Sequence, residues 1–187
     1  MINLTINGKA CTAPDGATIM EAAKANDIHI PNLCFLENVH QYGACRICVV
    51  EVEGAKNLQA SCMVKAREGM VIHTNSPKVR KARKMLYELM ISNHPKDCLS
   101  CERNQSCQLQ ALGQELGVTE CRLEGAMGPA HVDVSPSITR DTSKCILCRR
   151  CVAACKANQA VGVIGANERG FSTHIGCAFE APLGDSP

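Results

Sequence analysis

The first third of the chain alternates apolar and polar residues in short runs, and this period of two predicts half-buried β-strands. Runs at residues 2–7 and 9–14 meet at Asn7-Gly8, a dipeptide strongly favoured in tight hairpin turns. Residues 48–54 and 70–75 predict two further strands. The order strand, strand, helix, then more strands favours a small mixed sheet packed on one helix.

The helix of this first unit is predicted within residues 15–27. Thr18 is the expected N-cap, and Glu21 follows it by three residues. This spacing is a capping box, in which each side chain bonds the backbone N–H of the other residue.

A longer helix is predicted from residue 76 to about Asn93, because His94 precedes Pro95 and the residue before a proline disfavours helical geometry. Its apolar residues recur at helical spacing and form one stripe: Val79, Ala82, Leu86 and Leu89. Its basic residues fall on the other faces, where we expect solvent or an acidic partner: Arg80, Lys81, Arg83 and Lys84.

Two shorter helices are predicted further along the chain. Residues 108–118 place three leucines toward a core: Leu109, Leu112 and Leu116. Residues 152–160 favour a second short helix.

Composition indicates that disulfides or bound metals, rather than a large apolar core alone, stabilise this chain. The 187 residues include 14 cysteines but no tryptophan and only 3% aromatic residues, so large apolar anchors are scarce. The first residues resemble a strand rather than a secretion signal, and the cysteines fall in tight x2 groups typical of metal sites. We therefore expect a reduced, cytoplasmic metalloprotein.

Charge and hydropathy exclude two classes of partner. A net charge of +2 and the lack of aromatic residues among the basic ones argue against nucleic acid. No apolar run approaches the roughly 20 residues of a transmembrane helix, so we expect no membrane partner.

The cysteine groups divide the chain into segments 1–77, 78–132 and 133–187. The first group has the spacing x10, x2 and x13: Cys34, Cys45, Cys48 and Cys62. Four thiolates converging from loops suit a 2Fe–2S cluster, with a zinc site or four buried thiols as alternatives. Gly43 and Ala44 are small enough to let backbone N–H groups approach the sulfur atoms. Cys11 lies outside the pattern and is expected to be a buried free thiol.

The second group joins a histidine to three cysteines in the spacing H-x3-C-x2-C-x5-C: His94, Cys98, Cys101 and Cys107. Taken alone, this set fits a zinc ion as well as an iron–sulfur cluster. Cys121 lies outside the motif and is expected to be structural.

The third group has the spacing C-x2-C-x2-C-x3-C: Cys145, Cys148, Cys151 and Cys155. In two-cluster ferredoxins the fourth cysteine of such a run ligates the other cluster. Either the sequence is cut short of a second run, which would add a third 4Fe–4S cluster, or Cys177 serves as a substitute ligand for the cluster on the first three.

All three motifs, in this order, resemble the N-terminal iron–sulfur region of iron-only hydrogenases and of the large iron–sulfur subunit of complex I. The resemblance implies an α+β chain with three parts. These are a β-grasp 2Fe–2S ferredoxin domain, a small helical His/Cys3 4Fe–4S domain and an incomplete bacterial-ferredoxin-like 4Fe–4S domain. It assigns one 2Fe–2S cluster to the first cysteine group and one 4Fe–4S cluster to each of the other two, with Cys155 on a neighbouring cluster.

The pattern is most similar to the iron–sulfur diaphorase subunit of NAD-coupled hydrogenases, a group that includes electron-bifurcating ones. The resemblance implies an electron-transfer subunit between a flavoprotein NADH-binding subunit and a hydrogenase-like catalytic subunit in a hetero-oligomer. The chain has no G-x-G-x-x-G turn, no P-loop and no catalytic residues of its own. The alternatives are the electron-transfer arm of an NAD-dependent formate dehydrogenase, a free polyferredoxin that carries electrons, and a scaffold protein stabilised by zinc.

Overall fold

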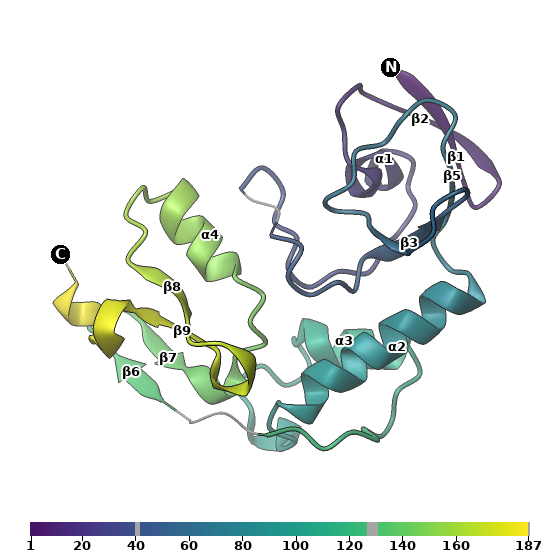
Figure 1. The fold of residues 1–187 in the computed structure, drawn as a ribbon. Coiled ribbons are helices and arrows are strands. Elements are labelled where there is room, and N and C mark those ends of the chain that lie inside the picture. Colours follow the sequence, from purple (N-terminus) through teal and green to yellow (C-terminus); the bar gives the residue numbers. More distant parts are fainter. Residues whose placement is uncertain (40–41, 127–130, 187) are drawn as a thin grey trace.

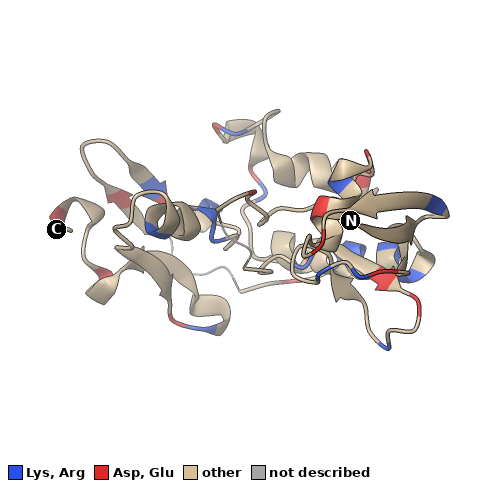
Figure 2. Ribbon diagram, turned by 90° about the horizontal axis from the view of Figure 1, so that it is seen from above, with Lys and Arg blue, Asp and Glu red and all other residues tan. Residues whose placement is uncertain are grey.

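The computed structural model describes residues 1–39, 42–126 and 131–186. Figure 1 shows its parts in chain order: a sheet with one helix at the N-terminal end, a helical middle, and two small hairpins with one helix at the C-terminal end. The first and last parts lie at opposite ends of the molecule, and the helical middle joins them. Figure 2 shows acidic and basic residues interspersed along its whole length. None of the helices in the described ranges is long and apolar enough to cross a membrane.

The first part is built on a five-stranded sheet in the order β2-β1-β5-β3-β4. Its strands are β1 (Ile2–Ile6), β2 (Lys9–Ala13), β3 (Val49–Val52), β4 (Gln59–Ala60) and β5 (Val71–His73). The predicted hairpin is confirmed, since Ile6 pairs with Lys9 across Asn7 and Gly8, whose φ angles are 52° and 80°. β1 and β5 are parallel, whereas the other neighbours are antiparallel, so the sheet is mixed as expected.

The predicted first helix is α1 (Ile19–Ala25). The capping box is confirmed: Thr18 Oγ1 accepts from the Glu21 N–H, and a Glu21 carboxylate oxygen accepts from the Thr18 N–H at 2.7 Å. α1 buries Ile19 and Met20 in the same apolar cluster as Ile6 and Ile72 of the sheet. Cys11 is buried in this cluster too, as predicted.

The middle part consists of α2 (Pro77–Ser92) and α3 (Gln108–Glu115), with a 3₁₀ turn at Cys98–Ser100 between them. α2 begins after the N-cap Ser76 and ends at the C-cap Asn93, so its predicted end is confirmed. α3 buries Leu109 and Leu112 against the apolar cluster that contains Tyr87, and Leu116 packs on it half-buried.

The predicted faces of α2 need correction. Leu89 is 54% exposed, whereas Arg83, expected to face solvent or a partner, is only 4% exposed. The buried positions are Val79, Arg83, Tyr87 and Glu88, and the first three form a row spaced by four residues. The row can include an arginine because its guanidinium donates to two backbone carbonyls of the first segment, those of Ile47 and Val49, each at 2.9 Å.

The third part contains two hairpins and one helix. Its elements are β6 (Val132–Val134), β7 (Thr139–Asp141), α4 (Arg150–Ala157), β8 (Ile164–Asn167) and β9 (His174–Cys177). Short 3₁₀ turns occur at Thr142–Lys144, Gly170–Ser172, Ala178–Glu180 and Leu183–Asp185. Buried Asp133 pairs with Arg140 across the first hairpin, and Arg140 donates to the Ile175 carbonyl of the second at 2.9 Å. This pair therefore holds the two hairpins together.

Candidate metal centres

The four cysteines of the first group are buried next to one another. Cys34 and Cys45 are 4% and 9% exposed, and Cys48 and Cys62 are fully buried. The Sγ atoms of Cys48 and Cys62 lie 3.4 Å apart. Cys34 lies well before β3 in the sequence, whereas Cys62 follows β4. The fold therefore brings together thiols that are distant along the chain.

The ionisation of these four thiols is linked. Hydrogen bonds from the thiols of Cys45 and then Cys62 lower the pKa of Cys34 to about 2. The pKa of Cys45 is raised by the same bond to Cys34 and by burial. The Cys62 thiol lowers the pKa of Cys48 to about 6, whereas the bonds to Cys34 and Cys48 raise the pKa of Cys62. Four thiolates cannot share this buried space without cations, which iron ions would supply.

The backbone before the cysteine pair is shaped for close approach. Gly43 has a φ of 58°, and a Cβ atom there would lie 2.9 Å from Met63 Cγ. Backbone N–H groups of Cys45 and Ala44 donate to the Cys34 sulfur and help to lower its pKa. Gly43 and Ala44 are expected to let backbone N–H groups approach the cysteine sulfur atoms, and this geometry supports that expectation.

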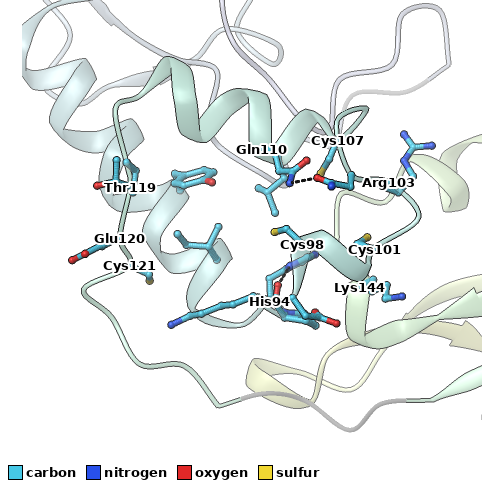
Figure 3. Close-up of a pocket in the computed structure, with 18 residues that line it drawn as sticks. His94, Cys98, Cys101, Arg103, Cys107, Gln110, Thr119, Glu120, Cys121 and Lys144 are labelled. Atoms are coloured by element: carbon cyan, nitrogen blue, oxygen red, sulfur yellow. Dashed lines mark hydrogen bonds between the residues drawn. The ribbon is translucent and has the colours of Figure 1, made fainter.

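The second group lines a cavity of about 490 Å³ in the helical middle part. Figure 3 shows His94, Cys98, Cys101 and Cys107 around this cavity, with Cys121 on another part of the wall. His94 follows the end of α2, Cys98 begins the 3₁₀ turn and Cys101 directly follows it, and Cys107 is the N-cap residue of α3. Helix ends therefore place the four donors.

The His94 ring has one nitrogen available for a ligand. Its Nδ1 lies 2.9 Å from the carbonyl oxygen of Pro95. A carbonyl oxygen can only accept, so Nδ1 carries a proton, and in the neutral ring Nε2 then keeps its lone pair. This carbonyl fixes the tautomer, as is usual for metal-binding histidines.

Cys121 has other contacts. Its thiol lies 3.4 Å from the Glu88 carbonyl and 3.3 Å from the Leu123 carbonyl. The next residue, Arg122, forms an ion pair with the carboxylate of Glu88. The contacts with Glu88 hold residues 121 and 122 on α2, which fits the structural role predicted for Cys121.

The third group surrounds the start of α4. Cys145 ends the 3₁₀ turn Thr142–Lys144, Cys151 lies in the first turn of α4, and Cys155 follows one turn later. The Leu147 N–H donates to the Cys145 sulfur at 3.4 Å. Burial raises the pKa of both Cys145 and Cys151, so a bound cation is needed to hold them as thiolates.

The x2 gaps of two groups share an unusual backbone conformation. Arg46, Leu147 and Arg149 each have a φ between 55° and 60°, the left-handed region that non-glycine residues rarely occupy. In each of these gaps a left-handed residue turns the chain between two cysteines that are three positions apart. Strain of this kind concentrates at functional sites.

All fourteen cysteines are free thiols in the structure. Cys177 is 3% exposed at the end of β9, where it pairs with Ile164 of β8. Its expected part as a substitute ligand stays a prediction, as does the assignment of Cys155 to a neighbouring cluster. In the described ranges no three His, Cys, Asp or Glu side chains converge as the ligands of one metal ion. The fit of clusters rests on the donor sets, the burial and the cavity described above.

The comparisons with known proteins match the three segments in order. Residues 1–77 match a 2Fe-2S iron-sulfur cluster binding domain, residues 83–122 the NADH-ubiquinone oxidoreductase-G iron-sulfur binding region, and residues 138–159 a 4Fe-4S binding domain. The whole chain is 44% identical to the NADP-reducing hydrogenase subunit HndD of Solidesulfovibrio fructosivorans and spans 33% of that protein. The chain is an iron–sulfur homologue of NAD(P)-reducing hydrogenase subunits.

Two further relatives support this homology. The NAD-reducing hydrogenase HoxS subunit gamma of Cupriavidus necator is 36% identical over 152 residues, which are 81% of this chain and 64% of that subunit. A crystal structure of NAD+-reducing [NiFe]-hydrogenase in the H2-reduced state superposes with a TM-score of 0.92 at 29% identity. The match covers 99% of this chain and 79% of that one. This chain therefore has the same α+β arrangement of ferredoxin-type domains as the matched part of the solved structure.

Sequence patterns did not reveal the polar residues that join the segments. Arg83 and Arg150 carry no motif that distinguishes them from surface arginines, and their partners are between 34 and 115 residues away. Only the fold brings these residues to the cysteine loops.

Proposed function

We propose that the chain is an electron-transfer subunit, which passes electrons between a flavin- and NAD(H)-binding module and a hydrogenase catalytic module. The observation that carries the proposal is the placement of three soft-donor sets along one short chain, where neighbouring sets border shared cavities. Cys45 and Cys145 line the same cavity of about 450 Å³, although they belong to different segments. Lys144, beside Cys145, lines the cavity of the second group.

Each donor set suits one cluster. We assign a 2Fe–2S cluster to Cys34, Cys45, Cys48 and Cys62; a 4Fe–4S cluster to His94, Cys98, Cys101 and Cys107; and a second 4Fe–4S cluster to Cys145, Cys148 and Cys151. When bound, such clusters supply one-electron redox chemistry, and the protein tunes it. The chain's own residues hold the iron with thiolates and one imidazole, and at the first site burial of all four cysteines excludes water.

The donor set of the second site distinguishes it from the other two. Neutral imidazole in place of a thiolate removes one negative charge, which on the Rieske precedent raises the reduction potential. We therefore expect the His94 site to be the easier of the two 4Fe–4S sites to reduce.

The proposed partners follow from the relatives. HndD and HoxS gamma are both described as subunits of NAD(P)-reducing hydrogenases. By analogy, the partners of this chain are a flavoprotein NADH-binding subunit and a hydrogenase-like catalytic subunit, in a cytoplasmic hetero-oligomer.

The test is anaerobic purification of the tagged chain from the organism that encodes it. The proposal expects a brown complex that contains a flavoprotein and a hydrogenase-like chain, with clusters that NADH or H2 reduces. A brown chain that purifies alone would indicate a free polyferredoxin instead. Reduction by formate would indicate a formate dehydrogenase arm, and a colourless zinc protein would overturn the proposal altogether.

A further inference from the structure

One arginine contacts all three segments next to the proposed cluster ligands. Arg150 is the first residue of α4 and directly precedes Cys151. Its Nη1 donates to Oε1 of Gln108 at 2.8 Å, and its Nη2 donates to the carbonyl oxygen of Phe35 at 3.1 Å. Gln108 directly follows Cys107, and Phe35 directly follows Cys34.

These contacts span large distances along the chain. Phe35 is 115 residues from Arg150 and Gln108 is 42 residues away. A planar guanidinium donates through several N–H groups in a fixed fork, so one side chain can hold both partners at a set separation. Arg150 thus connects the loops of the first, second and third sites at one point.

The charge of Arg150 lies among the sites, and no carboxylate of the described residues forms an ion pair with it. Its Nε is fully buried and has no hydrogen-bond partner among the residues that the structure describes. A cation that is partly withdrawn from water is screened less than one on the surface. An electron added to a neighbouring cluster makes that cluster more negative, so a nearby cation favours the reduced state.

We propose that Arg150 is a positioning residue that sets the relative placement of the three cluster loops, and that its charge raises the reduction potentials of the clusters beside it. This inference rests on the proposed function, since it requires iron–sulfur clusters at the three sites. It makes two separable claims: the fork controls geometry, and the charge controls potential.

The experiment compares Arg150→Gln and Arg150→Lys with the parent, as full-length chains purified anaerobically with their clusters. Arg169→Gln is the matched control, because Arg169 is an exposed arginine of the same segment. Iron content is measured first, then midpoint potentials by EPR-monitored redox titration. The relaxation enhancement of the 2Fe–2S signal by reduced 4Fe–4S clusters reports the spacing between sites.

For Arg150→Gln we expect parent iron content and, for at least one cluster, a roughly tenfold shift toward the oxidised form, which is 59 mV for a one-electron couple. The relaxation enhancement should also change. Arg150→Lys keeps the charge but not the fork, so its potentials should stay near the parent values while the enhancement changes.

If Arg150→Gln matches Arg169→Gln in both its midpoint potentials and its relaxation enhancement, the proposal is overturned. If Arg150→Gln loses its iron, the positioning claim is tested with Arg150→Lys. An unchanged relaxation enhancement of the 2Fe–2S signal in that folded variant contradicts the claim. A parent chain that contains zinc or no iron would instead refute the proposed function, so the two failures are distinguishable.

Discussion

At the scale of single residues, the chemistry of the second site depends on His94. The bond from its Nδ1 to the Pro95 carbonyl leaves Nε2 as the potential ligand atom. The sequence motif predicted this residue as a donor, but not the tautomer, because the tautomer is set by backbone geometry after the end of α2.

We expect His94→Cys to retain a 4Fe–4S cluster with a lower reduction potential, because a thiolate adds negative charge to the site. His94→Ala should lose or convert that cluster, whereas the cluster on Cys145 should survive both changes. EPR spectra of the reduced proteins test this, and an unaltered spectrum of His94→Ala would contradict the assignment.

Arg83 shows why the polar face of a helix could not be predicted from periodicity. Its position on α2 reads as a surface position, yet it is 4% exposed because the carbonyls of Ile47 and Val49 accept from it. Burial lowers its pKa, so the protein retains the charge at some cost and relies on these bonds. The two carbonyls lie on either side of Cys48.

Arg83→Met should therefore destabilise the folded chain by about 3 kcal/mol, since it removes the buried side-chain donor to two backbone carbonyls. Lys84→Met, at the next and exposed position of α2, is the control and should change stability by less than about 0.5 kcal/mol. Urea unfolding under anaerobic conditions measures both. Equal effects of the two changes would show that the Arg83 bonds contribute little.

At the scale of elements, local signals predicted the structure best. The Asn7-Gly8 hairpin, the Thr18 capping box and the end of α2 depend on residues within a few positions of one another, and all three are confirmed. The buried face of α2 depends instead on what packs against it. That partner, β3, is distant in sequence, so the prediction for Leu89 and Arg83 was wrong.

The packing of α2 also affects whether the first segment can stand alone. The segment contains all four of its proposed ligands, but Cys34 and Cys45 share an apolar cluster with Tyr87 of α2. We expect residues 1–77 to fold with two irons and two sulfides, and residues 1–93 to do so with a higher melting temperature. Arg83→Met in residues 1–93 should remove much of that gain. Equal stability of the two fragments, or one bound zinc, would contradict this prediction.

The stability of the β8–β9 hairpin should depend on pH near neutrality, because His174 begins β9. The carbonyl of Ser172 first, and then the carboxylate of Glu180 at 2.8 Å, raise the pKa of His174. A raised pKa in the folded state means that the contribution to stability is complete below the unfolded pKa of about 6.5 and is lost as pH rises through the folded value.

The melting temperature of the parent should accordingly fall by about one to two degrees over the pH interval just above 6.5. His174→Gln and Glu180→Gln should both flatten this dependence. Thermal melts between pH 6 and about 8.5 test the prediction, and a parent slope that persists in both variants would contradict it.

At the scale of the whole molecule, the structure joins three small units through one apolar cluster, a few polar contacts and shared cavity walls. Cysteine spacing predicted the three sites in order, and the comparisons match the same three regions as iron–sulfur domains. The spacing could not predict that Cys45 and Cys145 border one cavity, or that Arg150 contacts all three loops. These features arise only when segments far apart in the chain meet.

The central claim is that this chain holds one 2Fe–2S and two 4Fe–4S clusters that exchange electrons. Iron and sulfide analysis with an EPR-monitored redox titration of the anaerobically purified full chain tests it most directly. We expect about ten irons per chain and three distinct, magnetically interacting one-electron signals. A colourless chain that contains zinc, or clusters that titrate without magnetic interaction, would contradict it.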